Sequence, residues 1–104
     1  QQEPPWTINS DTIAPVNSHF WDWILWIAGK EARSMKNMVR KELEKMYAHL
    51  LAPLGCTRSP GSVEEAVRDY IAAFKRQKNL FHTEVDPALE IEVIKGLRMM
   101  GFQL

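Results

Sequence analysis

The sequence predicts an all-α fold, a bundle of about four helices with an extended N-terminal lead-in. Apolar residues recur at three- and four-residue steps through several segments, which is the spacing of one buried helix face. Residues 62–65 and 86–87 have the composition of helix starts. With 104 residues, of which 45% are apolar, the chain has room for one domain with one modest core.

Residues 1–17 are expected to form the extended lead-in segment, and residues 18–104 the helical bundle domain. The lead-in contains three prolines and shows neither helical nor strand periodicity. Trp6 and Ile13 are expected to attach it to the bundle, because apolar side chains gain nothing in a free linker.

The first helix is predicted to run from about residue 18 to residue 33, with Asn17 or Ser18 as its N-cap. Trp21, Trp23 and Trp26 point in different directions around its axis, so we expect it to be covered on most sides. A helix of this kind is typical of the centre of a bundle, or of one wall of a pocket shared with a partner.

A second amphipathic pattern covers residues 35–51, and Pro53 and Gly55 predict its end. Residues 54–61 are then expected to form a loop. Gly29 and Ser34 weaken helical structure without forbidding it. The pattern therefore leaves open whether the first two helices form one long rod or meet at a bend.

The third helix is predicted to begin at a capping box, in which the hydroxyl of Ser62 serves the amide of Glu65 and Glu65 returns the bond. Six apolar residues are expected on its inner face: Val63, Val67, Tyr70, Ile71, Phe74 and Phe81.

A fourth helix is predicted to open at Asp86 and Pro87 and to run to Met100, with Gly101 at its end. Residues 89–93 also alternate like a β-strand. We prefer a helix there because the chain contains no second candidate strand.

Charge, apolar runs and cysteine content indicate which partners and which compartment to expect. Thirteen basic residues balance thirteen acidic ones, so no net charge favours nucleic acid or an anionic membrane surface. The longest apolar run, residues 20–29, is shorter than the roughly 20 residues that span a bilayer. Cys56 is the only cysteine, which fits a reducing compartment. We therefore expect a cytoplasmic protein that binds neither nucleic acid nor a membrane. No signal peptide is visible. The absence of an initiator methionine suggests a fragment, a processed product or only the ordered part of something longer.

Lys30 is the first candidate for a binding residue. It lies four residues after Trp26 and three before Arg33, so the three share one side of the predicted helix. Two cations beside an aromatic wall could hold a phosphate and stack a base or a sugar. The alternative is that both cations are solvated or paired with acids such as Glu31.

The same helix resembles part of the C-terminal helical domain of the aminoglycoside nucleotidyltransferase group, including the kanamycin type. The resemblance rests on the aromatic start F-W-D-W-I-L at residues 20–25, the A-G-K tripeptide at residues 28–30, and the K-E-A-R-S continuation at residues 30–34. In that family a helical bundle packs against a mixed sheet domain, and the lysine at the Lys30 position reaches the nucleotide phosphates. The resemblance implies a substrate-side or nucleotide-side domain with these site residues: Trp23, Trp26, Lys30 and Arg33 facing the ligand, and Asp22 and His19 as polar neighbours.

Two departures limit what the resemblance implies. Kanamycin-type enzymes carry a general-base glutamate four residues before that lysine, where this chain has Trp26, and Asp22 could replace it only in a shifted helix. The family's catalytic half also needs a Gly-Ser followed by a D-x-D that binds magnesium. This chain has Gly61-Ser62 but no D-x-D. We therefore expect no catalytic residue, metal ligand or cofactor in this chain, with ATP and magnesium entering only through a further catalytic domain.

The second hypothesis is a non-catalytic helical module for protein interaction or dimerisation, in which the tryptophan helix is core and its exposed part contacts a partner. The histidines do not favour a metal site, because His19, His49 and His82 are scattered along the chain. The partners considered are a sheet-containing catalytic domain, a second copy of the chain and a small-molecule substrate. A Gly-Ser and a D-x-D in a longer reading frame would favour the nucleotidyltransferase hypothesis.

Overall fold

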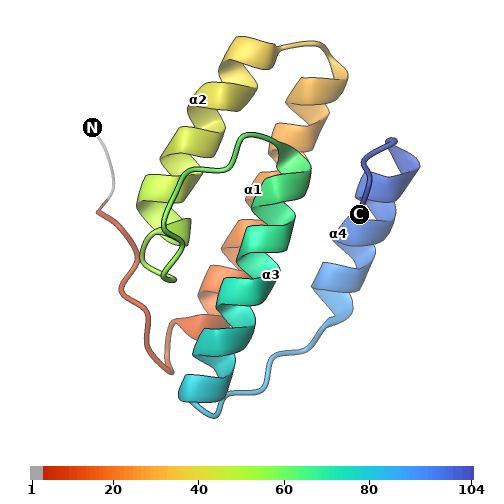
Figure 1. The fold of residues 1–104 in the computed structure, drawn as a ribbon. Coiled ribbons are helices and arrows are strands. Elements are labelled where there is room, and N and C mark those ends of the chain that lie inside the picture. Colours follow the sequence, from red (N-terminus) through yellow and green to blue (C-terminus); the bar gives the residue numbers. More distant parts are fainter. Residues whose placement is uncertain (1–3) are drawn as a thin grey trace.

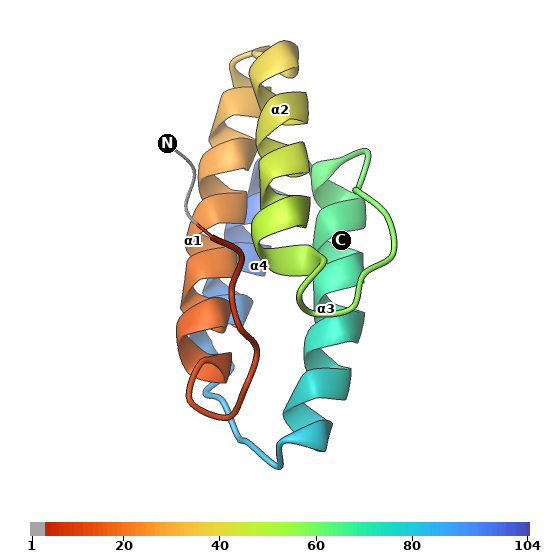
Figure 2. The same ribbon diagram turned by 90° about the vertical axis from the view of Figure 1, so that its left-hand side faces the viewer.

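A computed structural model describes residues 4–104, and within that range the chain is helical and contains no strand. Four α-helices are present: α1 (Ile13–Ala32), α2 (Lys36–Met46), α3 (Val63–Leu80) and α4 (Ala88–Met99). A π-helical turn, η1 (Tyr47–Leu51), continues α2. The predicted all-α bundle is confirmed, and residues 89–93 belong to α4. The helix α1 is central, because α2, α3 and α4 all pack against it (Figure 1, Figure 2).

The helix α1 begins at Ile13, so the predicted start near residue 18 was wrong. A turn before the helix explains the early start. The side-chain oxygen of Asn9 accepts hydrogen bonds from the amides of Asp11 (2.8 Å) and Thr12 (3.1 Å), and the Thr12 hydroxyl accepts one from the Asn9 amide (2.9 Å). Pro15 then falls in the first turn, where its missing amide proton costs nothing.

Asn17 is not the helix cap that the sequence predicted, but a buried residue inside α1 with 4% of its surface exposed. Its Oδ1 accepts hydrogen bonds from Nε1 of Trp21 (2.9 Å) and from the hydroxyl of Tyr70 (2.7 Å). Burial raises the pKa of Tyr70, and the nearby Glu90 raises it further, so the hydroxyl remains a donor. Ser18, the other expected cap, is exposed on α1.

Aromatic rings fill the contact between α1 and α3. Phe20 and Tyr70 stack almost parallel, with ring centres 3.8 Å apart, and Phe74 stacks on Tyr70 with ring centres 5.2 Å apart. Trp21 meets Tyr70 edge-on at 5.6 Å. Each such aromatic pair stabilises the fold by about 0.5–1.5 kcal/mol, in addition to the stabilisation that comes from burying the surface of the rings. This core holds the outer residues of α1 in fixed positions.

The expectation that α1 is covered on most sides was wrong. Asp22, Leu25 and Trp26 are exposed, and Trp26 exposes 47% of its surface. The neighbouring helices cover the core side of α1 and leave a strip along its outer side open to solvent. We call the strip formed by Asp22, Leu25, Trp26, Lys30 and Arg33 the outer face of α1.

A tight turn joins α1 to α2, so the first two helices do not form one long rod. Ser34 has a φ of 62°, in the left-handed region that ends helices. The helix α2 then runs back alongside α1 (Figure 1). Its predicted end is confirmed, since η1 stops at Leu51 and Gly55 takes a φ of 104°.

The start of α3 matches the predicted capping box in one of its two bonds. The amide of Glu65 donates to the hydroxyl of Ser62 (3.1 Å), while the Glu65 carboxylate accepts from the amide of Gly61 (3.0 Å) instead of that of Ser62. One residue of the predicted inner face was wrong, because Ile71 is 38% exposed. Ala66 and Ala73 are buried in its place.

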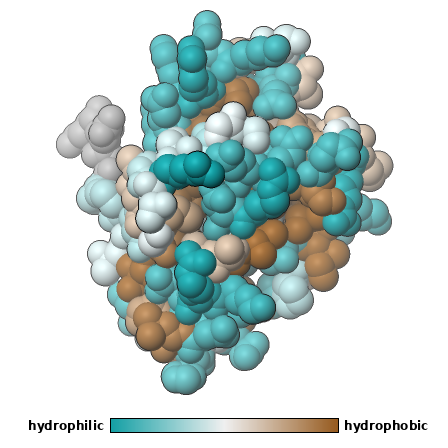
Figure 3. All heavy atoms as spheres, viewed as in Figure 1, coloured by the Kyte–Doolittle hydropathy of each residue, from teal (hydrophilic) through white to brown (hydrophobic). Residues whose placement is uncertain are grey.

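The helix α4 packs on α1 and stands apart from the lower part of α3 (Figure 1). The Asp86 carboxylate accepts a hydrogen bond from the amide of Ala88 (2.9 Å), and Gly101, at a φ of 101°, follows the helix as predicted. Apolar atoms reach the surface on the side of the molecule where α3 and α4 lie (Figure 3). No helix in the described residues has the length and apolarity to cross a membrane.

Candidate functional site on the outer face of helix α1

Lys30 and Trp26 form a cation–π pair on the outer face of α1. The Nζ atom of Lys30 lies 4.9 Å from the centre of the Trp26 ring. Their spacing of four residues places them on successive turns of one side, as predicted. The lysine stem can cover part of the ring while the ammonium, with three donors, still faces solvent. Lys30 is half-buried and Trp26 is exposed, so both groups are accessible to a ligand.

Arg33 lies just beyond the end of α1, where its amide donates to the carbonyl of Lys30 (3.1 Å). Its side chain is exposed. Within residues 4–104 neither Lys30 nor Arg33 forms a salt bridge, so the expected alternative of pairing with Glu31 is not seen. One cation, Lys30, therefore lies over the exposed Trp26 ring, and a second, Arg33, lies at the end of the same helix.

Glu31 forms no salt bridge with these cations within the described residues. Partial burial raises the pKa of Glu31, the negative charge of Glu64 raises it further, and Lys36 lowers it.

Trp23 belongs to the contact between α1 and α2. Its Nε1 donates to one carboxylate oxygen of Glu42 (3.1 Å), and the other oxygen accepts from Nζ of Lys45 (3.1 Å). The polar atom of Trp23 is therefore already engaged, and only its ring is left for a ligand, so its predicted role beside Trp26, Lys30 and Arg33 stays a prediction.

His19 lies in a separate cluster of four rings formed by Trp6, His19, Trp23 and His49. Neighbouring ring centres are 5.2 to 6.3 Å apart, and those of the two histidines are 5.7 Å apart. The amide of Trp6 donates to the carbonyl of His49 (3.0 Å), so Trp6 attaches the lead-in as predicted. Residues 4–12 accordingly run along the bundle beside α1 (Figure 2).

Pro53 makes this attachment possible. In an α-helix the His49 carbonyl would accept from the amide of residue 53, and Pro53 has no amide proton. In a π-helix it would accept from the amide of Leu54. That amide instead donates to Leu50 (3.3 Å) and Leu51 (3.1 Å), which leaves the His49 carbonyl for Trp6. The sequence carried no signal for the pairing of His19 with His49, since neither periodicity nor a motif links the two positions.

The six predicted site residues thus fall into two groups. Seven positions separate His19 from Trp26, and seven also separate Trp26 from Arg33, which is about 10 Å along the helix axis in each case. His19 and Trp23 lie with the ring cluster, while Trp26, Lys30 and Arg33 lie toward the end of α1. Asp22 is exposed one turn before Trp26 and two turns before Lys30.

No group of three or more histidine, cysteine, aspartate or glutamate side chains lies close enough together in residues 4–104 to hold a metal ion. The arrangement offers binding groups, namely an aromatic face, an ammonium and a guanidinium.

Comparisons of this chain with protein families, with curated proteins and with solved structures find no match. The likeness to the nucleotidyltransferase group therefore rests on the short motifs of residues 20–34 alone.

Proposed function

We propose that this chain is the helical nucleotide-side domain of a nucleotidyltransferase-like protein, and that the outer face of α1 binds the nucleotide. The observation that carries the proposal is the Lys30 ammonium 4.9 Å above the exposed ring of Trp26. In this arrangement one residue pair supplies both a stacking surface and a charge for phosphate.

Each residue has a distinct part in the proposed site. Trp26 offers a flat apolar surface on which a base or sugar can stack, a contact worth about 1–3 kcal/mol per base. Lys30 acts as a point charge for a phosphate oxygen, and Arg33 offers a planar fork that can hold two oxygens of one phosphate. Neither cation must first break a salt bridge within the described residues.

The chemistry of transfer would come from another domain or another chain. Trp26 occupies the position of the family's general base and cannot accept a proton from a hydroxyl. The proposed role of this domain is therefore to bind and orient the nucleotide, while a sheet-containing partner domain provides the magnesium site and activates the acceptor.

Titration of the full-length protein with ATP, ADP and adenosine tests the proposal. We expect affinity to rise with the number of phosphates and to fall with added salt, because the cations of the outer face are exposed. Isothermal calorimetry at two salt concentrations measures both effects. Equal affinity for adenosine and ATP, or no binding of any of them, would contradict the proposal.

Leu25 and Trp26 favour a second candidate function, a protein-interaction module. They are adjacent, apolar and 39% and 47% exposed. Leu25→Ser would remove apolar surface without touching the cation–π pair. If Leu25→Ser dissociates a complex in analytical ultracentrifugation and leaves ATP affinity unchanged, the outer face has an interaction role of its own.

A further inference from the structure

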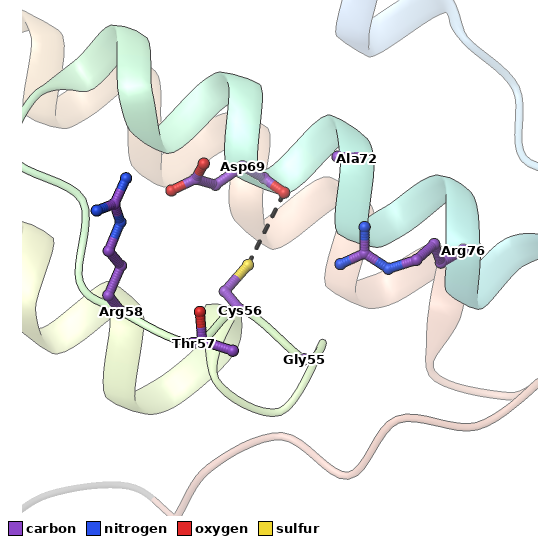
Figure 4. Close-up of a pocket in the computed structure, with 7 residues that line it drawn as sticks. All are labelled: Gly55, Cys56, Thr57, Arg58, Asp69, Ala72 and Arg76. Atoms are coloured by element: carbon purple, nitrogen blue, oxygen red, sulfur yellow. Dashed lines mark hydrogen bonds between the residues drawn. The ribbon is translucent and has the colours of Figure 1, made fainter.

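A pocket lies on the opposite side of the bundle from α4, between the loop that follows η1 and the helix α3 (Figure 1, Figure 4). Its volume is about 250 Å³. Seven residues line it: Gly55, Cys56, Thr57, Arg58, Asp69, Ala72 and Arg76. Loop and helix both contribute, so the pocket exists only in the folded chain.

Two guanidinium groups flank this pocket. Arg58 comes from the loop and Arg76 from α3, and they lie on either side of Cys56 (Figure 4). Neither forms a salt bridge with any other described residue. Arg58 is two positions from Cys56 in the chain, whereas Arg76 is 20 positions away and is brought to the pocket by the fold.

The remaining polar groups set the charge of the pocket. The Cys56 thiol donates to the backbone carbonyl of Asp69 (3.8 Å), and the Asp69 carboxylate is half-buried beside it. Burial raises the pKa of the Cys56 thiol and the charge of Asp69 raises it further, while Arg76 lowers it. Two cations thus face one anion and a neutral thiol.

We propose that this pocket binds a small oxyanion, a carboxylate or a phosphate group, at one of the two guanidinium groups that stand at its opposite ends, those of Arg58 and Arg76 (Figure 4). Guanidinium forks match the paired oxygens of both groups, and two unpaired forks around one hollow leave a net positive charge for the ligand. Thr57 adds a hydroxyl donor at the rim.

The size of the pocket limits the ligand. A water molecule takes about 30 Å³ of liquid volume, so the hollow has room for roughly eight waters, enough for an oxyanion group and its hydration or a few further atoms. Typical pockets for larger ligands begin at about 300 Å³. The pocket shares no residue with the outer face of α1, so this proposal does not depend on the nucleotide site proposed there.

Cys56 provides an internal reporter for the proposal, because it is the only cysteine of the chain. Iodoacetate and iodoacetamide both react with it by attack of the thiolate on the carbon that bears iodine. A carbon–sulfur bond forms, iodide leaves and the thiol proton passes to solvent. The two reagents differ in charge, so the ratio of their rates reports the affinity of the pocket for a carboxylate. The fraction of thiolate affects both rates equally and cancels in the ratio.

We expect Arg58→Gln and Arg76→Gln each to lower the ratio of the iodoacetate rate to the iodoacetamide rate by about two- to fivefold, the effect of one charge at a few ångströms in water. Lys95→Gln removes an exposed cation from α4 and is the matched control, which should leave the ratio unchanged. A ratio that responds equally to all three changes would contradict the proposal.

Protection of Cys56 gives a second measurement. Acetate or phosphate should slow the iodoacetamide reaction of the wild-type protein in a saturable way, relative to chloride at equal ionic strength. Protection by acetate alone assigns the pocket to carboxylates, and protection by phosphate alone assigns it to phosphates. If neither anion protects Cys56, the pocket binds no oxyanion and the proposal is wrong.

Discussion

Asn17 joins two helices through a single buried oxygen. Its Oδ1 accepts from Trp21 on its own helix and from Tyr70 on α3, and all three side chains are buried. A buried donor without an acceptor costs about 1–3 kcal/mol. The residue therefore fixes the register of α1 against α3 as well as contributing to stability.

We expect Asn17→Ala to lower the free energy of unfolding by about 2–4 kcal/mol, because it leaves two donors unpaired. Tyr70→Phe removes one donor, keeps the stacking on Phe20 and should cost about 1 kcal/mol. Urea unfolding measures both. Ser18→Ala, on the exposed side of the same helix, is the control. A larger loss in Tyr70→Phe than in Asn17→Ala would show that Asn17 does not hold the network.

Glu31 should make stability depend on pH. Its pKa is raised in the folded state, so the folded protein binds a proton more readily than the unfolded chain does. The destabilising effect of the charged carboxylate is therefore present at neutral pH and is lost as pH falls through the folded pKa toward the ordinary value.

We expect Glu31→Gln to raise the melting temperature at pH 7 and to lose this advantage near pH 4. Thermal unfolding followed by circular dichroism at several pH values measures the difference. Glu84→Gln, which changes an exposed carboxylate, serves as the control. An advantage of equal size at pH 4 and pH 7 would mean that the charge of Glu31 is not its cause.

At the scale of the helices, the start of α3 depends on one side-chain cap. The amide of Glu65 donates to the hydroxyl of Ser62, and the extended backbone of Ser62 directs the hydroxyl there. We expect Ser62→Ala to cost about 1 kcal/mol in urea unfolding. Ser59→Ala, in the exposed loop before it, should change stability by less than about 0.5 kcal/mol. Equal effects of the two changes would contradict the cap.

Local signals predicted α2, α3 and α4 well, because each begins or ends at residues whose chemistry acts within one turn. Pro53, Gly55, Ser62 and Gly101 are such residues. The start of α1 was missed because a proline in a first turn is indistinguishable by composition from a proline in an extended segment. The helical periodicity of apolar residues also could not show that Ala73, and not Ile71, is buried. The packing of α3 against α1 decides which of the two is covered.

In the candidate sites, too, contacts within one helix could be predicted from the sequence and contacts between elements could not. Trp26 and Lys30 lie four residues apart in one helix, so their contact could be predicted from spacing alone. The bond from Trp23 to Glu42 and the approach of Arg76 to Cys56 join different elements. Only the packing of the helices brings these pairs together, and no sequence pattern encodes it.

At the scale of the whole molecule, three helices pack around α1 and leave its outer face open. A central helix that exposes a tryptophan and two cations is suited to contribute one wall of a site that another domain completes. We expect the 104-residue chain by itself to show no nucleotidyl transfer from ATP to kanamycin. Turnover above background that a point change within the chain abolishes would show that the catalytic groups lie within it.

The most direct test of the account is the affinity of the full-length protein for ATP after Lys30→Met. Methionine keeps an unbranched stem against Trp26 and removes only the charge. We expect affinity to fall by about 1.5–3 kcal/mol, roughly 10- to 150-fold, while unfolding free energy changes by less than about 0.5 kcal/mol. Lys41→Met, which removes an exposed cation from α2, should leave affinity unchanged. If Lys30→Met lowers stability and leaves ATP affinity unaltered, Lys30 is a structural residue and the outer face of α1 is not a nucleotide site.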